Sequence, residues 1–161
     1  MCSSDLPPHP SGAARDREGL RSAVEALERL GSRRLFLGGQ SYGGRQATML
    51  AAETPALVEG LLLVSYPLHP PGRPLDLRTA HFPALRTSAL FAHGSTDPFG
   101  TLEELDAARA LIPARTALVA IDGAGHGLGH GRASRPAAGT VERVVEEFLS
   151  FVGEEAVGGG S

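Results

Sequence analysis

Residues 39–43 read GQSYG, a serine with a glycine two positions away on each side. They follow the short apolar run 35–37 and lead into a segment, 43–53, whose apolar residues recur at helical spacing. The serine therefore lies between a predicted strand and a predicted helix, the setting in which a sharp turn projects the hydroxyl above a sheet. We interpret Ser41 as the candidate nucleophile of an acyl-transfer reaction.

The glycines of this segment have a steric role in the prediction. Gly39 and Gly43 would relieve the crowding of a strained turn, and Gly38 and Gly44 would add further freedom, because glycine has no Cβ. Tyr42 follows the serine, so its backbone N–H can point at a developing oxyanion. The alternative interpretation is a plain glycine-rich turn between a strand and a helix.

A serine hydroxyl is a weak nucleophile and needs a base, which an acid in turn orients. Asp97 follows a predicted strand at 89–93, and His126 follows the next one at 116–121. Carboxyl ends of parallel strands meet at one edge of a sheet, where such sites assemble. Each residue also has a simpler interpretation, Asp97 as a turn former before Pro98 and His126 as a surface-loop histidine.

The chain alternates predicted helices and strands, which indicates one domain with a mostly parallel sheet of about four strands flanked by helices. Residues 1–14 are expected to be a disordered lead-in, 15–153 the domain and 154–161 a flexible tail. The predicted helices are 16–30, 43–53, 101–111 with a TLEE capping box, and 140–152; the predicted strands are 35–37, 60–66, 89–93 and 116–121.

Composition excludes several functions. The 161 residues carry 15 basic and 18 acidic side chains, a net charge of -3, which gives no support to nucleic-acid or anionic-membrane binding. No segment approaches the ~20 apolar residues of a membrane helix. A signal-peptide core is absent from residues 1–10, so a cytoplasmic location is expected. With a single cysteine, neither a disulfide framework nor a multi-cysteine metal site is predicted, and no cofactor is expected.

Four motifs together resemble a known family. They are GGQSYGGR at 38–45, YPLHPPG at 66–72, LRTAHF at 77–82 and GSTDPFG at 94–100. The series, over roughly Glu18–Val152, is similar to bacterial dienelactone-hydrolase-like proteins, which share a domain with an animal testis-expressed hydrolase-like protein and with a subunit of the non-specific-lethal chromatin complex. The resemblance implies an α/β-hydrolase fold, a small-molecule acyl substrate, and Ser41, Asp97 and His126 as the triad. Gln40 departs from the family, where a basic residue is usual before the serine.

The same comparison suggests that early strands of the fold are missing. One helix and one strand precede Ser41, without the loop that supplies a second oxyanion N–H in α/β-hydrolases. We therefore expect the C-terminal part of the fold, weakly active or inactive as it stands, with 35–37 as an exposed apolar edge strand. A non-catalytic interaction domain is the alternative function. Oligomeric state is left open.

Other candidate sites are weaker. Nucleotide binding is disfavoured, because the glycine spacing at 38–44 is imperfect and the next strand ends in Ser65 rather than an acid. A metal pair of His126 and His130 is rejected, since the intervening glycines oppose a helix. His69 and His81 are expected to be solvated loop residues, with lining of the site entrance as the alternative. His93 is expected to have a structural role at the end of a strand. For Arg45, a salt bridge across the surface is expected, with a substrate contact as the alternative.

Overall fold

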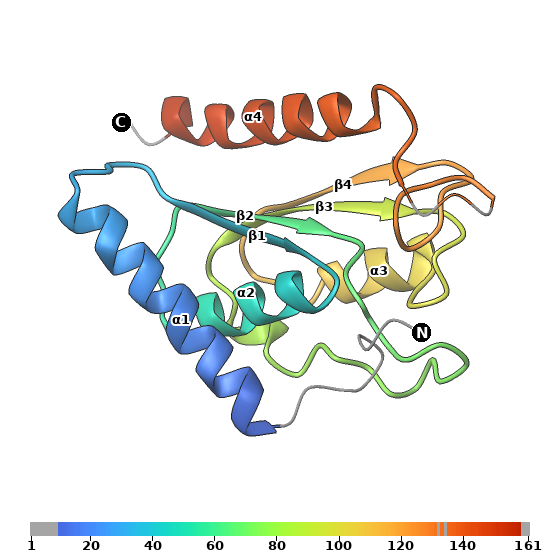
Figure 1. The fold of residues 1–161 in the computed structure, drawn as a ribbon, viewed down its shortest axis with the longest axis horizontal. Helices are drawn as coiled ribbons and strands as arrows, with labels where there is room; N and C mark the ends of the chain where they lie inside the picture. The colour runs from blue at the N-terminus through green and yellow to red at the C-terminus, as the bar shows by residue number, and fades with distance from the viewer. Residues whose placement is uncertain (1–9, 132, 134, 159–161) are drawn as a thin grey trace.

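The computed structural model describes residues 10–131, 133 and 135–158. Helices and strands alternate along the chain, as the sequence predicted (Figure 1). In order they are α1 (Pro10–Arg29), β1 (Phe36–Gln40), α2 (Tyr42–Glu53), β2 (Gly60–Val64), the 3₁₀ helix η1 (Phe82–Ala84), β3 (Ser88–Gly94), α3 (Leu102–Arg109), β4 (Thr116–Ile121) and α4 (Thr140–Gly158).

The strands form a parallel sheet in the order β1-β2-β3-β4, which confirms the predicted α/β class. Their register is aligned at the carboxyl ends: Gln40 lies opposite Val64, and Val64 lies opposite Ala92. All four arrows in Figure 1 therefore point the same way. Residues that follow different strands are consequently delivered to one edge of the sheet.

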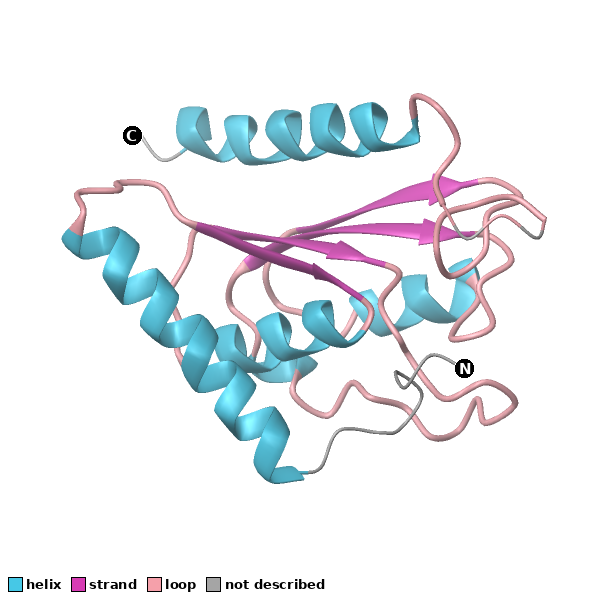
Figure 2. Ribbon diagram, in the orientation of Figure 1, coloured by secondary structure: helices cyan, strands magenta, loops and turns pink. Residues whose placement is uncertain are grey.

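Helices cover both faces of the sheet. Helix α4 lies on one face, and α1, α2 and α3 lie on the other (Figure 2). Within β3, Leu90 and Ala92 join the core under α4, whereas Ala89 and Phe91 join the core under the other helices. This explains the unbroken apolar run of that strand, because neither of its faces meets water. Full burial of a side chain such as Phe91 contributes about 1.5–3 kcal/mol.

Strand β1 lies at the edge of the sheet, as expected, and within the described residues it pairs with β2 alone. Gly38 and Gln40 are exposed along it. The apolar residues of the strand are less exposed than predicted. Phe36 is half-buried, and its ring packs edge-to-face on Phe148 of α4 with centroids 5.5 Å apart.

Two helices extend beyond their predicted ends. Helix α1 begins at Pro10, six residues before Asp16, so residues 10–14 of the predicted lead-in are helical. Proline suits a first helical turn, where its missing N–H has no partner to lose. Helix α4 ends at Gly158, within the predicted tail. Residues 1–9 and 159–161, the remainder of both predicted segments, lie outside the described residues.

The predicted capping box at the start of α3 is present. The Thr101 hydroxyl accepts a hydrogen bond from the Glu104 N–H (3.1 Å), and a Glu104 carboxylate oxygen accepts one from the Thr101 N–H (2.8 Å). Both interactions satisfy donors that would otherwise lack partners at the helix start.

We predict that Thr101→Ala lowers the free energy of unfolding by about 1 kcal/mol, because it removes the side-chain half of this cap. Glu103→Gln, an exposed change one position from the box, should cost no more than about 0.5 kcal/mol. Urea denaturation of both variants measures the difference. Equal stability of the two variants would contradict the assigned cap.

Candidate active site

Ser41 lies at a sharp elbow between β1 and α2. Its backbone has φ 51° and ψ -116°, a conformation that residues other than glycine rarely adopt. The elbow is held from both sides: the Ser41 N–H donates to the Val64 carbonyl (2.9 Å), and the Ser41 carbonyl accepts from the Arg45 N–H (3.1 Å). The strained position predicted from the GQSYG segment is therefore present.

The steric roles of the glycines differ from those predicted. A Cβ on Gly39 would lie 2.6 Å from the Gly43 carbonyl carbon and 2.7 Å from the Gly44 nitrogen, and a Cβ on Gly44 would lie 2.8 Å from the Gly39 oxygen. A Cβ on Gly43 would meet nothing within 4 Å. The close approach of strand and helix therefore requires Gly39 and Gly44, whereas Gly43 has room for a side chain.

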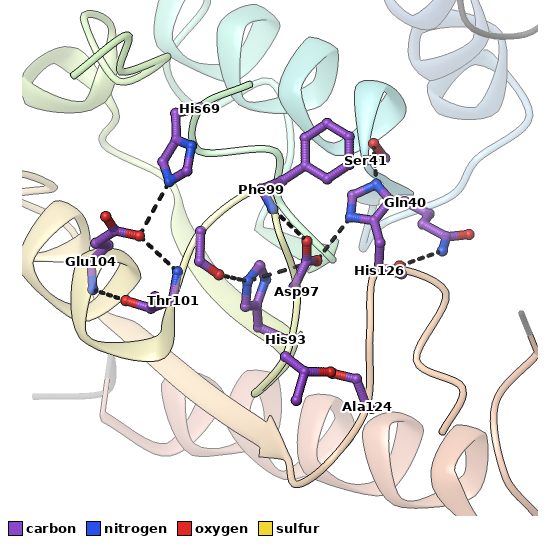
Figure 3. A network of polar contacts seen from close by, with 12 residues as sticks. Gln40, Ser41, His69, His93, Asp97, Phe99, Thr101, Glu104, Ala124 and His126 are labelled. Carbon is purple, nitrogen blue, oxygen red and sulfur yellow. Dashed lines mark hydrogen bonds and ion pairs between the residues drawn. The ribbon is translucent and has the colours of Figure 1, made fainter. Parts of the chain in front are cut away.

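The three candidate residues come together (Figure 3). His126 Nε2 lies 2.8 Å from Ser41 Oγ, and His126 Nδ1 lies 2.8 Å from Asp97 Oδ2. A carboxylate can only accept, so Nδ1 carries the proton and Nε2 is left to accept from the serine. This is the order of contacts needed to activate a serine hydroxyl.

The Asp97 side chain is fully buried and nevertheless well paired. Its Oδ2 accepts from His126, and its Oδ1 accepts from the Phe99 N–H (2.9 Å). His93, also fully buried at the end of β3, lies 3.7 Å from the same Oδ2 and donates from Nε2 to the Gly100 carbonyl (2.8 Å). His93 therefore holds the turn that carries the acid, which the strand-end prediction did not anticipate.

The loop of His126 is tied to the loop of Asp97. The Thr96 N–H and hydroxyl both donate to the Ala124 carbonyl, each at 2.9 Å. Gly94 lies so close to this carbonyl that an added Cβ could not be accommodated without movement of backbone. These contacts fix the two loops relative to each other, which sequence order alone could not show.

The His126 ring is positioned by contacts on two sides. The Phe99 ring lies against it, with centroids 4.2 Å apart. The Gln40 amide donates to the His126 carbonyl (3.2 Å), so this departure from the family pattern has a structural role here. The His126 side chain retains 26% exposure, which leaves the ring accessible beside the serine.

His69 is buried and hydrogen-bonded, not solvated as predicted. Its Nδ1 donates to the Pro70 carbonyl (2.8 Å) and its Nε2 lies 3.2 Å from the Glu104 carboxylate (Figure 3). The Pro70 hydrogen bond raises the pKa of His69 most; burial opposes it and Glu104 adds to it. The His69 N–H also donates to the Phe99 carbonyl (3.0 Å). His69 and Glu104 therefore support the loop that carries Asp97. In the sequence, only the capping box that includes Glu104 pointed to this part of the structure.

His81 and Arg45 also differ from their predictions. His81 is half-buried, and its Nε2 lies 2.8 Å from the Thr48 hydroxyl. Burial, and then the charges of Arg45 and Arg17, lower the pKa of His81 to about 4, so the ring is neutral near pH 7. Arg45 has no ion pair with any described residue, and its Nε is buried without a hydrogen-bond partner.

The Tyr42 backbone lies directly after Ser41, and its phenol contacts a residue of another helix. As the first residue of α2 it has an N–H without an intrahelical acceptor, next to Ser41. Its hydroxyl donates to Asp16 of α1 (2.7 Å). Burial, followed by Asp16, raises the pKa of the Tyr42 phenol to about 12, so it stays protonated near neutral pH.

Among the described residues, no group of three His, Cys, Asp or Glu side chains is arranged to hold a metal ion. His126 contacts Ser41 and Asp97, and His130 lies 2.9 Å from the Asp122 carbonyl, so the two histidines serve different contacts. No helix in the described part of the chain is long and apolar enough to cross a membrane.

A parallel sheet with a serine elbow at its carboxyl edge defines the α/β-hydrolase class. Residues 8–153 match a family model described as "Alpha/beta hydrolase domain", and the chain therefore belongs to this family.

Solved structures share the fold at low sequence identity. An alpha-beta serine hydrolase homologue from Coxiella burnetii matches with TM-score 0.62 and 17% identity, over 96% of this chain and 65% of that one. A monoacylglycerol lipase from Paleococcus ferrophilus gives TM-score 0.67 and 13% identity, over 87% and 76%. A putative dienelactone hydrolase from Klebsiella pneumoniae gives 0.70 and 17%, over 88% and 61%. The chain thus spans less than two thirds of the first and third of these proteins.

We predict that Gly39→Ala destabilises the fold by about 1–3 kcal/mol or more, because its Cβ would overlap the backbone of α2. Gly43→Ala is the matched control from the same motif and should be neutral or slightly stabilising, since alanine favours a helix over glycine. Chemical denaturation compares the two. A harmless Gly39→Ala would show that strand and helix do not approach as described.

A second prediction concerns pH. His81 is protonated in the unfolded chain below about pH 6.5, but in the folded protein its pKa is about 4. Its contribution to stability is therefore complete above pH 6.5 and is lost as the pH falls towards 4. The drop in unfolding free energy from pH 7 to pH 5 should be smaller for His81→Gln than for the unaltered protein. His130→Gln, at an exposed position, serves as the control, and an unchanged drop in His81→Gln would refute the assignment.

Proposed function

We propose that this protein is a serine hydrolase acting on an ester, lactone or related acyl substrate. The observation that carries the proposal is the continuous contact from Ser41 Oγ through the His126 ring to Asp97, with both distances at 2.8 Å. The hydrolase family and the hydrolase-like neighbours support the general class. Their low identity supports the fold alone, so the triad rests on the geometry of this chain.

In the proposed reaction, Ser41 Oγ attacks the acyl carbon while its proton passes to His126 Nε2. Asp97 stabilises the resulting imidazolium through Nδ1–H, and the Tyr42 N–H faces the oxyanion. The imidazolium then protonates the leaving alcohol as the C–O bond breaks, which leaves an acyl-serine. Water, deprotonated by His126, releases the acid and restores Ser41. A site with one such oxyanion donor is expected to be about 10²–10³ slower than a complete one.

The alternative is a non-catalytic domain that binds a partner protein. The exposed edge of β1 favours it, because unpaired backbone groups at an edge strand can pair with another chain. A second reason for this alternative is the resemblance to dienelactone-hydrolase-like proteins, some of whose animal relatives act within protein complexes. In that case the elbow would be a structural feature of the fold, and Ser41 would not be reactive.

We predict that a fluorophosphonate probe labels Ser41 and that Ser41→Ala abolishes labelling and lowers activated-ester turnover by at least about 10³-fold. Ser88→Ala, at the opposite end of β3, is the matched control and should retain both activities. Peptide mass spectrometry locates the adduct. Turnover that survives in Ser41→Ala would reject the nucleophile, and a folded protein without any adduct would favour the interaction domain.

A further inference from the structure

We propose that Phe99 is a positioning residue of the reaction, whose ring face stabilises the positive charge that His126 acquires when it takes the serine proton. The inference rests on the proposed hydrolase function and adds to it a residue outside the triad. It follows from the stacking of the two rings, from the contacts that hold Phe99, and from the partial burial of the pair.

The Phe99 and His126 rings are stacked. Their centroids lie 4.2 Å apart, and their planes form an angle of 32°. An edge-to-face pair would have nearly perpendicular planes, and two rings lying side by side in one plane could not bring their centroids so close. The imidazole therefore lies over the face of the Phe99 ring, and Figure 3 shows the two rings next to each other.

This stack favours the charged form of the imidazole. The face of a benzene ring carries negative potential and attracts a cation within about 6 Å of its centre. In the proposed reaction, His126 is neutral before the attack and becomes an imidazolium as the serine proton is transferred. Only interactions that strengthen in the transition state accelerate the chemical step, and the attraction between Phe99 and His126 is of this kind.

The backbone of Phe99 is held on both sides. Its N–H donates to Asp97 Oδ1 (2.9 Å), and its carbonyl accepts from the His69 N–H (3.0 Å). The next carbonyl, that of Gly100, accepts from His93 Nε2 (2.8 Å). The aromatic ring thus belongs to the same turn as the acid, and it is in place before charge develops on the imidazole.

Asp97 and Phe99 act on different parts of the imidazole. The carboxylate lies at the ring edge, 2.8 Å from Nδ1, whereas Phe99 covers the ring face and leaves Nε2 to Ser41. Phe99 is half-buried and the His126 side chain is 26% exposed, so the stack is only partly shielded from water. The attraction of a cation to an aromatic face in such a setting corresponds to roughly 2–30-fold in rate.

Fluorinated phenylalanines in place of Phe99 test the charge effect separately from packing, because fluorine withdraws electrons from the ring face and changes its volume little. The kcat/KM for an activated ester should fall stepwise from the native ring through monofluoro and difluoro rings to the pentafluoro ring, by about 2–30-fold in total. Phe99→Tyr, which keeps an aromatic face, should retain most of the activity, and Phe99→Leu should lose about the same factor as the pentafluoro ring. The same fluorinated residues in place of Phe148, which packs on the uncharged Phe36 ring, are the control and should leave kcat/KM unchanged.

A measurement without turnover separates this inference from the proposed function. In the non-reactive Ser41→Ala protein, NMR follows the protonation of the His126 ring as the pH is lowered. Loss of a contact that stabilises the charged ring lowers the midpoint of this titration, by about 0.4–1.5 pH units between the native Phe99 and its pentafluoro form. Asp97 at Nδ1, with His93 behind it, is present in every variant, so the effects of both residues cancel in the comparison.

The two measurements together decide the inference. A lowered midpoint in a protein that hydrolyses no ester would sustain the contact between Phe99 and the imidazolium and reject the hydrolase. A midpoint that stays constant across the fluorinated series would overturn the inference, even with Ser41 fully reactive. In that case any loss of kcat/KM would be assigned to packing.

Discussion

The structure depends on one steric constraint, the contact between the end of β1 and the first turn of α2. Gly39 and Gly44 bring the two backbones so close that neither residue could carry a Cβ. This contact forces Ser41 into a conformation with positive φ and projects it from the elbow. Because the strands are parallel and aligned, the loops after β3 and β4 reach the same edge. The proposed triad follows from these two facts.

The acid and the base depend on a second set of contacts behind them. His93 holds the turn after Asp97, His69 and Glu104 brace it from α3, and Thr96 ties it to the His126 loop. His93 and Thr96 bond to backbone carbonyls, and the backbone N–H of His69 bonds to the Phe99 carbonyl, so the loops are positioned mainly through main-chain atoms. Such an arrangement limits reorganisation when charge develops on the imidazole.

The sequence predicted those features that local rules control. Strand and helix order followed from apolar periodicity, and the α3 start followed from the Thr101 capping box. The proximity of Ser41, Asp97 and His126 followed from their places after parallel strands. Long-range packing could not be predicted from the sequence. Pro10 begins a helix whose early turns are held by contacts such as Arg17 with Glu53, and the burial of His69 depends on a partner 35 residues away. The absence of a hydrogen-bond partner for Arg45 Nε among the described residues could be recognised only once its surroundings were known.

The edge position of β1 affects how the protein would lose its proposed activity. Within the described chain both edge strands lead to a residue of the proposed triad: β1, before Ser41, is bonded to β2 alone over five residue pairs, and β4, before His126, is bonded to β3 alone over six, so that the strands before Asp97 and His126 are bonded to each other. Edge strands open locally at lower free energy than interior ones. Opening of the five-residue β1–β2 ladder would withdraw the serine and leave the acid–base pair intact. Reactivity of the serine would thus report on local fraying well before the core unfolds.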